Sequence, residues 1–449
     1  MTNITITQSI SDWWGTSSTL MKPTVDSKSY HEARYKNLMI EYELYKAILS
    51  EDIQINKPFE SVYSTGLIGS FVDSELDNGD VIHEFLLENI PKDENKDPQD
   101  IQHIVIIHGY MAASGYFVKT FETLIKSKKW LKIHVIDLPG FGNSSRPKFP
   151  KELLKDYTDK FDKINQVLNI ENWFIDRIEL WRIKNSLTHF KLISHSMGGY
   201  LSCCYLMKYN MNQVKDLIIV SPMGTESSSM SLIHDKNLQV NHHELGSDPL
   251  RELITAQPLN EEINPELEKL WEKLGRPKFP KNIVLKKLWE WKISPFQLLQ
   301  LFGPLFSKFL SFWSFQRFKN LTSNEDDQGD NHDLILKLHY YSYSIFNQFQ
   351  GSGELAITKL INHEILPRLP LGERKLSQFF TDNQIRTLWL YGDKDWMNDK
   401  GGMAISEEIN QLGGESTFEM VPDAGHHIYL DNPEEFNKLV IDFFHLDNE

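Results

Sequence analysis

Cysteine is scarce in this chain of 449 residues, which contains only Cys203 and Cys204. Neighbouring residues on a helix are poorly placed for a disulfide bond, and so low a cysteine content is typical of a reducing compartment. No stretch of about 18 uninterrupted apolar residues occurs, so no membrane-spanning helix is predicted. The first 21 residues contain no Lys or Arg and no apolar core, unlike a secretory signal or an Arg-rich transit peptide. The sequence therefore predicts an intracellular protein.

Positive charge is also in short supply. Lys and Arg number 47 against 62 Asp and Glu, which gives a formal net charge of −15. This acidic balance argues against nucleic acid as the main partner. Apolar residues make up 40% and charged residues 24% of the chain, as in a globular protein. The length allows a large domain with insertions.

Ser196 lies between a short apolar run that predicts a strand and a predicted helix that opens on Gly198 and Gly199. A serine at such a tight strand-to-helix turn is held in a strained backbone conformation with its hydroxyl exposed, which is the nucleophile elbow of the α/β-hydrolases. Ser194 departs from that pattern, which has glycine two residues before the nucleophile. A buried helix start with the same residues is the alternative interpretation.

Short apolar runs that are typical of buried parallel strands surround this motif. From 223 to about 385 no clear strand is predicted, which indicates a long helical insertion. The alternation of strands and helices elsewhere predicts an α/β-hydrolase fold with a mostly parallel central sheet and a large helical cap insertion. The predicted strands lie at 62–68, 81–87, 104–107, 133–136, 190–193, 217–221, 387–392 and 417–421.

Four segments follow from this pattern. Residues 1–58 are predicted to be a peripheral N-terminal helical extension, and 59–222 the first part of the hydrolase core. Residues 223–384 are the helical cap, and 385–449 complete the core.

A nucleophilic serine needs a base, and the base needs an acid that orients it. Asp395 and His426 follow Ser196 in the chain order of α/β-hydrolases, each just beyond a predicted strand. We therefore predict a triad of Ser196, Asp395 and His426, with Asp393 and His427 as the alternative acid and base. Taken singly, a carboxylate that caps a turn and a structural histidine in a glycine loop are the ordinary interpretations.

An oxyanion hole requires two backbone N–H groups. We expect one from Met197, immediately after the nucleophile, and the other from Tyr110, after the strand that ends at His108 and Gly109. No metal site or cofactor is predicted.

Several motifs spread over most of the chain resemble one subfamily of the α/β-hydrolases. That subfamily contains the lipid-droplet lipase co-activator, its N-acyl phospholipid hydrolase relative and the yeast cardiolipin-specific deacylase. The motifs are Asp12-Trp13-Trp14, His108-Gly109-Tyr110, the loop 137–147, Ser196-Met197-Gly198-Gly199, Ile293-Ser294-Pro295-Phe296, Gly351-Ser352-Gly353-Glu354, the segment 391–397, and His426 with Asp431.

The resemblance implies phospholipids as substrates, with cardiolipin or a related anionic phospholipid as the expected one. The co-activator branch lacks the nucleophilic serine that this chain has at position 196, which favours an enzyme. The family's His-x4-Asp motif, which is linked to acyl transfer onto lysophosphatidic acid, falls on His426 and Asp431. Because His426 is also the predicted triad histidine, the motif does not separate hydrolysis from acyl transfer.

The cap contains a basic window in an otherwise acidic chain. Residues 269–319 carry eleven Lys or Arg and two Glu, a net charge of +9, together with four Trp and eight Phe. Basic and tryptophan side chains suit an anionic membrane interface. The residues expected to bind the membrane are Lys281, Lys286, Lys287, Lys292, Trp289 and Trp291. An ordinary helical lid whose aromatic side chains face an acyl tunnel is the alternative interpretation.

Three functions remain open. The favoured one is a serine acyl hydrolase that deacylates phospholipids through an acyl-enzyme at Ser196. A lysophosphatidic acid acyltransferase, with acyl-CoA as co-substrate, is the second, and a non-catalytic membrane-bound lipase regulator is the third. The expected location is an intracellular membrane surface: the mitochondrion by resemblance, otherwise the cytoplasm or lipid droplets.

Overall fold

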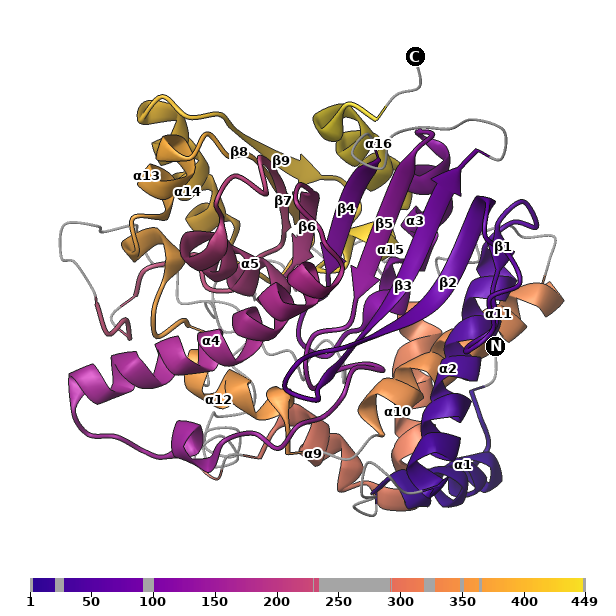
Figure 1. Cartoon of the computed structure of the whole chain (residues 1–449). Helices are drawn as coiled ribbons and strands as arrows, with labels where there is room; N and C mark the ends of the chain where they lie inside the picture. Colours follow the sequence, from indigo (N-terminus) through magenta and orange to yellow (C-terminus); the bar gives the residue numbers. More distant parts are fainter. Residues whose placement is uncertain are drawn as a thin grey trace, which may run out of the picture.

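The computed structural model describes residues 3–20, 28–91, 101–228, 230–233, 291, 293–318, 328–347, 351–362 and 366–446. In these residues nine strands form one sheet in the order β1-β2-β3-β5-β4-β6-β7-β8-β9 (Figure 1). The strands are β1 (Gln54–Ile55), β2 (Gly66–Glu75), β3 (Val81–Ile90), β4 (Gln102–Ile107), β5 (Leu131–Ile136), β6 (Lys191–His195), β7 (Asp216–Val220), β8 (Arg386–Gly392) and β9 (Ser416–Val421).

The strands from β5 across to β9 are parallel, whereas β3 pairs antiparallel with both β2 and β5. Helices α4, α5, α13 and α14 cover one face of the sheet, and α3 and α16 cover the other (Figure 1). The predicted fold class is therefore confirmed. The helices and short 3₁₀ turns of the core are η2 (Ser114–Phe117), α3 (Val118–Lys126), η3 (Lys151–Leu154), α4 (Lys160–Lys184), α5 (Met197–Tyr209), α13 (Leu376–Asp382), α14 (Asp399–Gln411), α15 (Ile428–Asp431) and α16 (Pro433–Phe444).

The strand predicted at 62–68 was wrong in its bounds. The backbone N–H groups of Val62 and Tyr63 both donate to the side-chain oxygen of Asn56, at 2.9 Å each, instead of pairing with a neighbouring strand. The strand begins only at Gly66, whose φ of 105° suits glycine, and it continues to Glu75.

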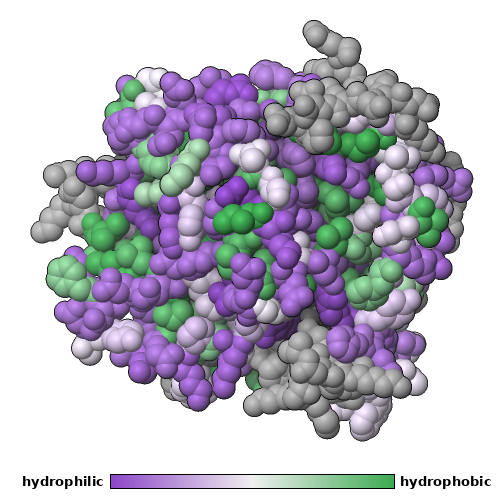
Figure 2. Space-filling model, in the orientation of Figure 1, coloured by the Kyte–Doolittle hydropathy of each residue, from purple (hydrophilic) through white to green (hydrophobic). Residues whose placement is uncertain are grey.

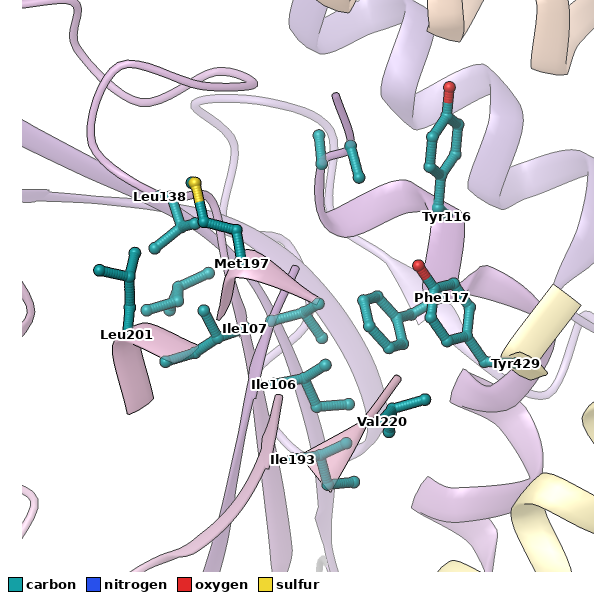
Figure 3. Close-up of a cluster of buried hydrophobic side chains, with 14 of the residues drawn as sticks. Ile106, Ile107, Tyr116, Phe117, Leu138, Ile193, Met197, Leu201, Val220 and Tyr429 are labelled. Atoms are coloured by element: carbon teal, nitrogen blue, oxygen red, sulfur yellow. The ribbon is translucent and has the colours of Figure 1, made fainter. Parts of the chain in front are cut away.

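The centre of the sheet is a buried apolar core. Ile106 of β4, Ile193 of β6 and Val220 of β7 lie side by side in it (Figure 3). On one side of these strands the ring of Phe117 stacks on Tyr429, with centroids 3.8 Å apart. Each fully buried aliphatic or aromatic side chain contributes about 1.5–3 kcal/mol to folding. The strand ends that carry the candidate site are therefore fixed by dense packing.

The N-terminal helices are more deeply integrated than a peripheral extension. Leu44, Tyr45 and the carboxyl group of Glu41 on α2 are fully buried. Glu41 accepts hydrogen bonds from Ser114 at 3.0 Å and from Asn143 at 2.7 Å. These bonds connect α2 to the loops that follow β4 and β5, so the N-terminal segment helps to shape the sheet end where the candidate site lies.

The cap helices pack on the N-terminal helices. Ser9 on α1 donates to the carbonyl of Pro304 at 2.7 Å, and Ser307 donates to Asp12 at 2.6 Å. The helices of the two regions are α1 (Ile6–Leu20), α2 (Lys28–Ile48), α9 (Pro295–Gln300), η4 (Gly303–Leu305), α10 (Phe306–Arg317), α11 (Gln328–Phe346), η6 (Gly353–Ala356), α12 (Ile357–Leu360) and η7 (Leu371–Glu373).

A glycine pair joins the cap motif 351–354 to the loop 137–147. A side chain on Gly140 would lie 2.5 Å from the backbone nitrogen of Gly353, and one on Gly353 would lie 2.5 Å from the carbonyl oxygen of Pro139. Only glycine allows the two backbones to approach so closely. The two subfamily motifs therefore form one contact between cap and core.

Hydrophobic side chains on the face shown in Figure 2 gather in separate patches among hydrophilic ones. Within the described ranges, no helix is both long enough and apolar enough to cross a bilayer.

His83 on β3 provides a test of the buried polar network. Its Nδ1 lies 2.9 Å from Asp73 and its Nε2 lies 3.3 Å from Glu41. Burial alone would lower the pKa of His83, but the two carboxylates raise it from 6.5 to about 10. A raised pKa stabilises the fold fully below the unfolded value near 6.5, and this stabilisation is lost as the pH rises towards 10.

We therefore expect His83→Gln to lower the free energy of unfolding by about 3 kcal/mol at pH 6, because it breaks a buried ion pair. The loss should shrink steadily as the pH rises towards 10. Urea denaturation at four pH values between 6 and 10 measures it. A loss that is constant over this range would show that His83 is neutral in the folded protein.

Candidate active site

Ser196 lies where β6 passes into α5, with φ of 53° and ψ of −117°. A serine rarely adopts this conformation, which must be held by its surroundings. The backbone N–H of Ser196 donates to the carbonyl of Val220 at 2.9 Å, and the Ser196 carbonyl accepts from Met223 at 3.1 Å. The predicted elbow geometry is present. Ser194, fully buried, fits in the place of the glycine of the family pattern.

Close approach of three backbone segments shapes the elbow. A side chain on Gly198 would lie 2.3 Å from the carbonyl oxygen of His108, and one on Gly109 would lie 2.7 Å from Cβ of Ser196. Glycine at both positions therefore lets the loop after β4 reach the serine. His108 secures that loop: its Nε2 accepts from Leu138 N–H at 2.9 Å, and its Nδ1 bonds the carbonyl of Gly109 at 2.7 Å.

Asp395 and His426 meet beyond the ends of β8 and β9. Nδ1 of His426 lies 3.1 Å from Oδ1 of Asp395, and only 5% and 2% of the two side chains are exposed. The same carboxylate oxygen accepts the backbone N–H of Met397 at 2.9 Å, which fixes its direction. With the Nδ1 proton donated to Asp395, Nε2 of His426 remains as the basic nitrogen.

His195, which the sequence analysis did not single out, supports the histidine loop. Its Nε2–H donates to the carbonyl of His426 at 2.9 Å, and its Nδ1 accepts from the hydroxyl of Tyr429 at 3.2 Å. Burial, with the charges of the neighbouring histidines His426 and His427, holds the pKa of His195 well below its usual value. It therefore stays neutral and links the end of β6, directly before Ser196, to the loop that carries His426. In the sequence, only the position of His195 directly before Ser196 pointed to this supporting role.

The structure gives the alternative acid and base other contacts. Asp393 accepts the backbone N–H of Ala424 at 3.1 Å and so stabilises the loop before His426. The ring of His427 lies 5.9 Å from that of Tyr116 and 5.1 Å from that of His195. The geometry therefore favours Asp395 and His426 as the pair.

Two backbone N–H groups flank the serine. Met197 is the first residue of α5, where an N–H has no intrahelical partner. Tyr110 follows Gly109, and its ring is anchored because its hydroxyl donates to the carbonyl of Glu354 at 3.0 Å. In the described part of the chain neither N–H donates a hydrogen bond. Both are thus available as the predicted oxyanion donors.

Asp431 lies beside the histidine loop, not in line with the imidazole and Asp395. Its Oδ2 accepts the backbone N–H of Gly425 at 2.9 Å, and its Oδ1 pairs with Arg317 of α10. Among the residues expected to bind the membrane, Trp291 is 67% exposed. Lys281, Lys286, Lys287, Lys292 and Trp289 lie outside the described residues.

The two cysteines are free and buried in α5. Burial raises the pKa of Cys203 to about 12, and it also raises that of Cys204. Both thiols therefore stay protonated and unreactive at neutral pH, so neither competes with Ser196 as the candidate nucleophile. No group of His, Cys, Asp and Glu suited to a metal ion occurs in the described ranges.

A strained serine, a histidine oriented by a carboxylate and two unoccupied N–H donors suit acyl transfer through a covalent intermediate. The constellation lies at the carboxyl ends of β6, β8 and β9, as in other open α/β sheets.

Comparison with known proteins agrees with this class. The family described as alpha/beta hydrolase fold matches residues 102–284. Protein ECM18 of Saccharomyces cerevisiae is 30% identical over 363 residues, which cover 76% of this chain and 70% of that protein. The 1-acylglycerol-3-phosphate O-acyltransferase ICT1 of the same yeast is 26% identical, over 76% of this chain and 81% of that protein. The (lyso)-N-acylphosphatidylethanolamine lipase of Homo sapiens is 25% identical, over 75% and 77%.

The chain belongs to the α/β-hydrolase family. Within it, the relatives place the chain in the subfamily that its motifs indicated, which includes named lipases and acyltransferases of phospholipids.

The triad assignment is testable by labelling. We expect Ser196→Ala to abolish covalent labelling by a fluorophosphonate probe while leaving the melting temperature near that of the wild type. His426→Ala and Asp395→Asn should each slow labelling by roughly three orders of magnitude or more, as in other triads.

Asp393→Asn is the matched control. This carboxylate lies in the same loop, but its hydrogen bond is to the backbone N–H of Ala424 and not to the imidazole of His426. A larger loss of labelling in Asp393→Asn than in Asp395→Asn would reverse the assignment of the acid.

Proposed function

We propose that the protein is a serine acyl hydrolase that removes an acyl chain from phospholipids through an acyl-enzyme at Ser196. The observation that carries the proposal is the oriented pair of His426 and Asp395, whose histidine ring lies 4.6 Å from that of His195, the residue directly before the strained Ser196. A regulator without catalysis needs none of this geometry, which costs backbone strain to maintain.

In the proposed reaction, Oγ of Ser196 attacks the ester carbonyl carbon while Nε2 of His426 takes the hydroxyl proton. The N–H groups of Met197 and Tyr110 bind the resulting oxyanion. The imidazolium, stabilised by Asp395, then protonates the leaving alcohol, and the ester C–O bond breaks to give the acyl-enzyme. Water, deprotonated by His426, attacks in turn and releases the fatty acid, and Ser196 regains its proton.

Phospholipid substrates are supported by the names of the relatives, one of which is a lipase of N-acylphosphatidylethanolamine. Cardiolipin or a related anionic phospholipid is the substrate we propose, on the resemblance of the motifs. The same resemblance leads us to propose the mitochondrial membrane as the location.

Acyl transfer to lysophosphatidic acid is the second candidate, and the likeness to a 1-acylglycerol-3-phosphate O-acyltransferase favours it. Acyl-CoA would then acylate Ser196, and the hydroxyl of the lysophospholipid would take the place of water. The two reactions share the first half, so they differ only in which acceptor reaches the acyl-enzyme.

The deciding experiment presents the purified protein with cardiolipin vesicles, and separately with lysophosphatidic acid and labelled acyl-CoA. We expect free fatty acid and monolysocardiolipin from the first mixture, and no product with Ser196→Ala. Transfer of label to phosphatidic acid without vesicle hydrolysis would establish the acyltransferase. The absence of both products with the wild type, in the presence of fluorophosphonate labelling, would exclude both substrates.

A membrane surface as partner is supported by an apolar patch on α10, η4 and the adjoining turn. Phe306, Leu310 and Trp313 of α10 face inward and are buried. The apolar side chains that are 41–72% exposed are Phe309 and Phe312 of α10, Leu305 of η4, and Leu301 and Phe302 of the turn before η4. Helix α1, which packs on η4 and α10, adds the exposed Ile6 and Trp14. Such amphipathic helices bind in the plane of a bilayer interface.

We expect the triple substitution of Phe302, Phe309 and Phe312 by serine to weaken binding to cardiolipin vesicles by at least tenfold. Transfer of even a partly exposed phenylalanine into lipid contributes about 1 kcal/mol or more. Co-sedimentation measures binding, and hydrolysis of a short soluble ester should stay near wild type.

Phe161→Ser is the matched control, because Phe161 is 74% exposed at the start of α4, far from α10 in Figure 1. Equal vesicle binding by the triple variant and this control would remove α10 from the membrane interface.

A further inference from the structure

Several contacts fix the loop that carries His426, and one of them leads to the cap. Asp395 binds the imidazole, and His195 donates to the His426 carbonyl. The contact that leads to the cap is the backbone N–H of Gly425, which donates to Oδ2 of Asp431 at 2.9 Å. Gly425 directly precedes His426, so this bond fixes the peptide unit between Ala424 and Gly425, one residue before the candidate catalytic histidine.

Asp431 reaches Gly425 because the chain turns back on itself. Residues 428–431 form the single turn α15, in which the N–H groups of Leu430 and Asp431 donate to the His427 carbonyl at 2.8 and 3.0 Å. This turn returns the fifth residue after His426 to the start of its own loop. The spacing of the His-x4-Asp motif is therefore explained by a backbone contact.

The other oxygen of Asp431 faces the cap. Its Oδ1 accepts from Nη1 of Arg317, 114 residues earlier in the sequence. The side chains of Asp431 and Arg317 are 2% and 9% exposed, so the pair is buried, and loss of either partner would break a buried ion pair. Arg317 is the last residue of α10, the helix whose outer side carries Phe309 and Phe312.

One carboxylate thus bridges the catalytic histidine loop and the cap helix that presents the apolar patch. We propose that Asp431 is a positioning residue, which aligns His426 through Gly425 and couples that alignment to helix α10 through Arg317. The role rests on the proposed function, since it regulates the same site. When α10 is displaced, Arg317 moves away from Asp431. The hydrogen bond between Asp431 and the Gly425 N–H then weakens, and His426 loses its alignment with Ser196.

This role differs from a direct one in acyl transfer. A carboxylate that already binds a backbone N–H and a guanidinium has its oxygens engaged, and it acts on the reaction through the placement of the imidazole. Hydrolysis and transfer share that imidazole, so both should depend on Asp431 to the same degree.

The test uses the full chain with Asp431→Asn, Asp431→Ala, Arg317→Met and the double variant of Arg317→Met with Asp431→Asn. Misplacement of a catalytic group by about 1 Å costs on the order of a hundredfold in rate. We therefore expect Asp431→Ala to lower kcat for a short soluble ester by about that factor, at nearly unchanged KM. Asp431→Asn, whose amide oxygen still accepts from Gly425, should lose less.

Two readouts separate positioning from general destabilisation. The double variant should lose hardly more kcat than the worse single variant, because both changes break one link. The acid limb of the kcat/KM profile should move to lower pH in Asp431→Asn, which removes a negative charge near His426. It should move to higher pH in Arg317→Met, which removes a positive charge. The other titratable or charged groups around the loop are unchanged in both: Asp393, Lys394, Asp395, His195, Asp423 and His427.

Arg386→Met is the matched control. Arg386 also pairs with a distant carboxylate, Asp216 at 2.7 Å, but at the start of β8, the opposite end of the sheet from the site. It should lower the melting temperature and leave kcat and both limbs of the pH profile as in the wild type.

Hydrogen exchange tests the link without any substrate. We expect faster exchange at the Gly425 amide and over 422–432 in Arg317→Met, although that residue lies on the cap, and no change there in Arg386→Met. If the wild type hydrolyses and transfers nothing, the proposed function fails while this measurement still decides the coupling. Wild-type exchange and wild-type kcat in Arg317→Met would overturn the coupling. Loss of acyl transfer alone in Asp431→Ala, with hydrolysis intact, would overturn the positioning role.

Discussion

The strained turn at Ser196 is the constraint on which the rest of the structure depends. A serine with φ of 53° is stable only where its neighbours fix it. The backbone of Ser196 is fixed by its hydrogen bond to the carbonyl of Val220 in β7 and by the apolar packing of β4 and β6 around it. The glycines at 109 and 198 are required by the same constraint, since a side chain at 109 would collide with Ser196 and one at 198 with the carbonyl of His108. A regular parallel sheet is thus the support that lets one irregular residue persist.

Buried polar networks fix the loops at the end of the sheet where Ser196 lies. His108 ties the loop after β4 to the loop after β5, and Glu41 of α2 ties both to the N-terminal helices. Asp137 accepts the N–H groups of Ser114 and Asn143, while burial and the nearby Glu41 raise the pKa of its carboxyl group. These bonds satisfy buried polar groups that would otherwise be costly, and they fix loops that a sheet alone leaves free.

Two of the contacts that join the cap to the core differ in kind. The backbones at Gly140 and Gly353 pack directly against each other, whereas Arg317 and Asp431 form a buried ion pair. The first contact is insensitive to small displacements of α10, because it lies on another element. The ion pair includes Arg317 of α10 itself, so a movement of α10 reaches the loop that carries His426 through this pair.

The sequence by itself determined the fold class and the order of the site residues. Parallel strands buried on both faces leave continuous apolar runs, and the elbow leaves a serine before two glycines, so both signals are local. It also predicted the partnership of Asp395 and His426, because strand ends on one sheet edge converge. It did not predict the extent of β2, where the side chain of Asn56 takes the N–H groups at 62 and 63.

Only the tertiary structure decided the roles that depend on residues far apart in the chain. His195 supports His426 across 231 positions, and Arg317 reaches Asp431 across 114. Such contacts carry no periodicity and no motif spacing, because packing of separate elements creates them. The burial of α2 could not be predicted for the same reason. A helix has the same amphipathic pattern whether its apolar face packs on the outside of a domain or on a buried polar network.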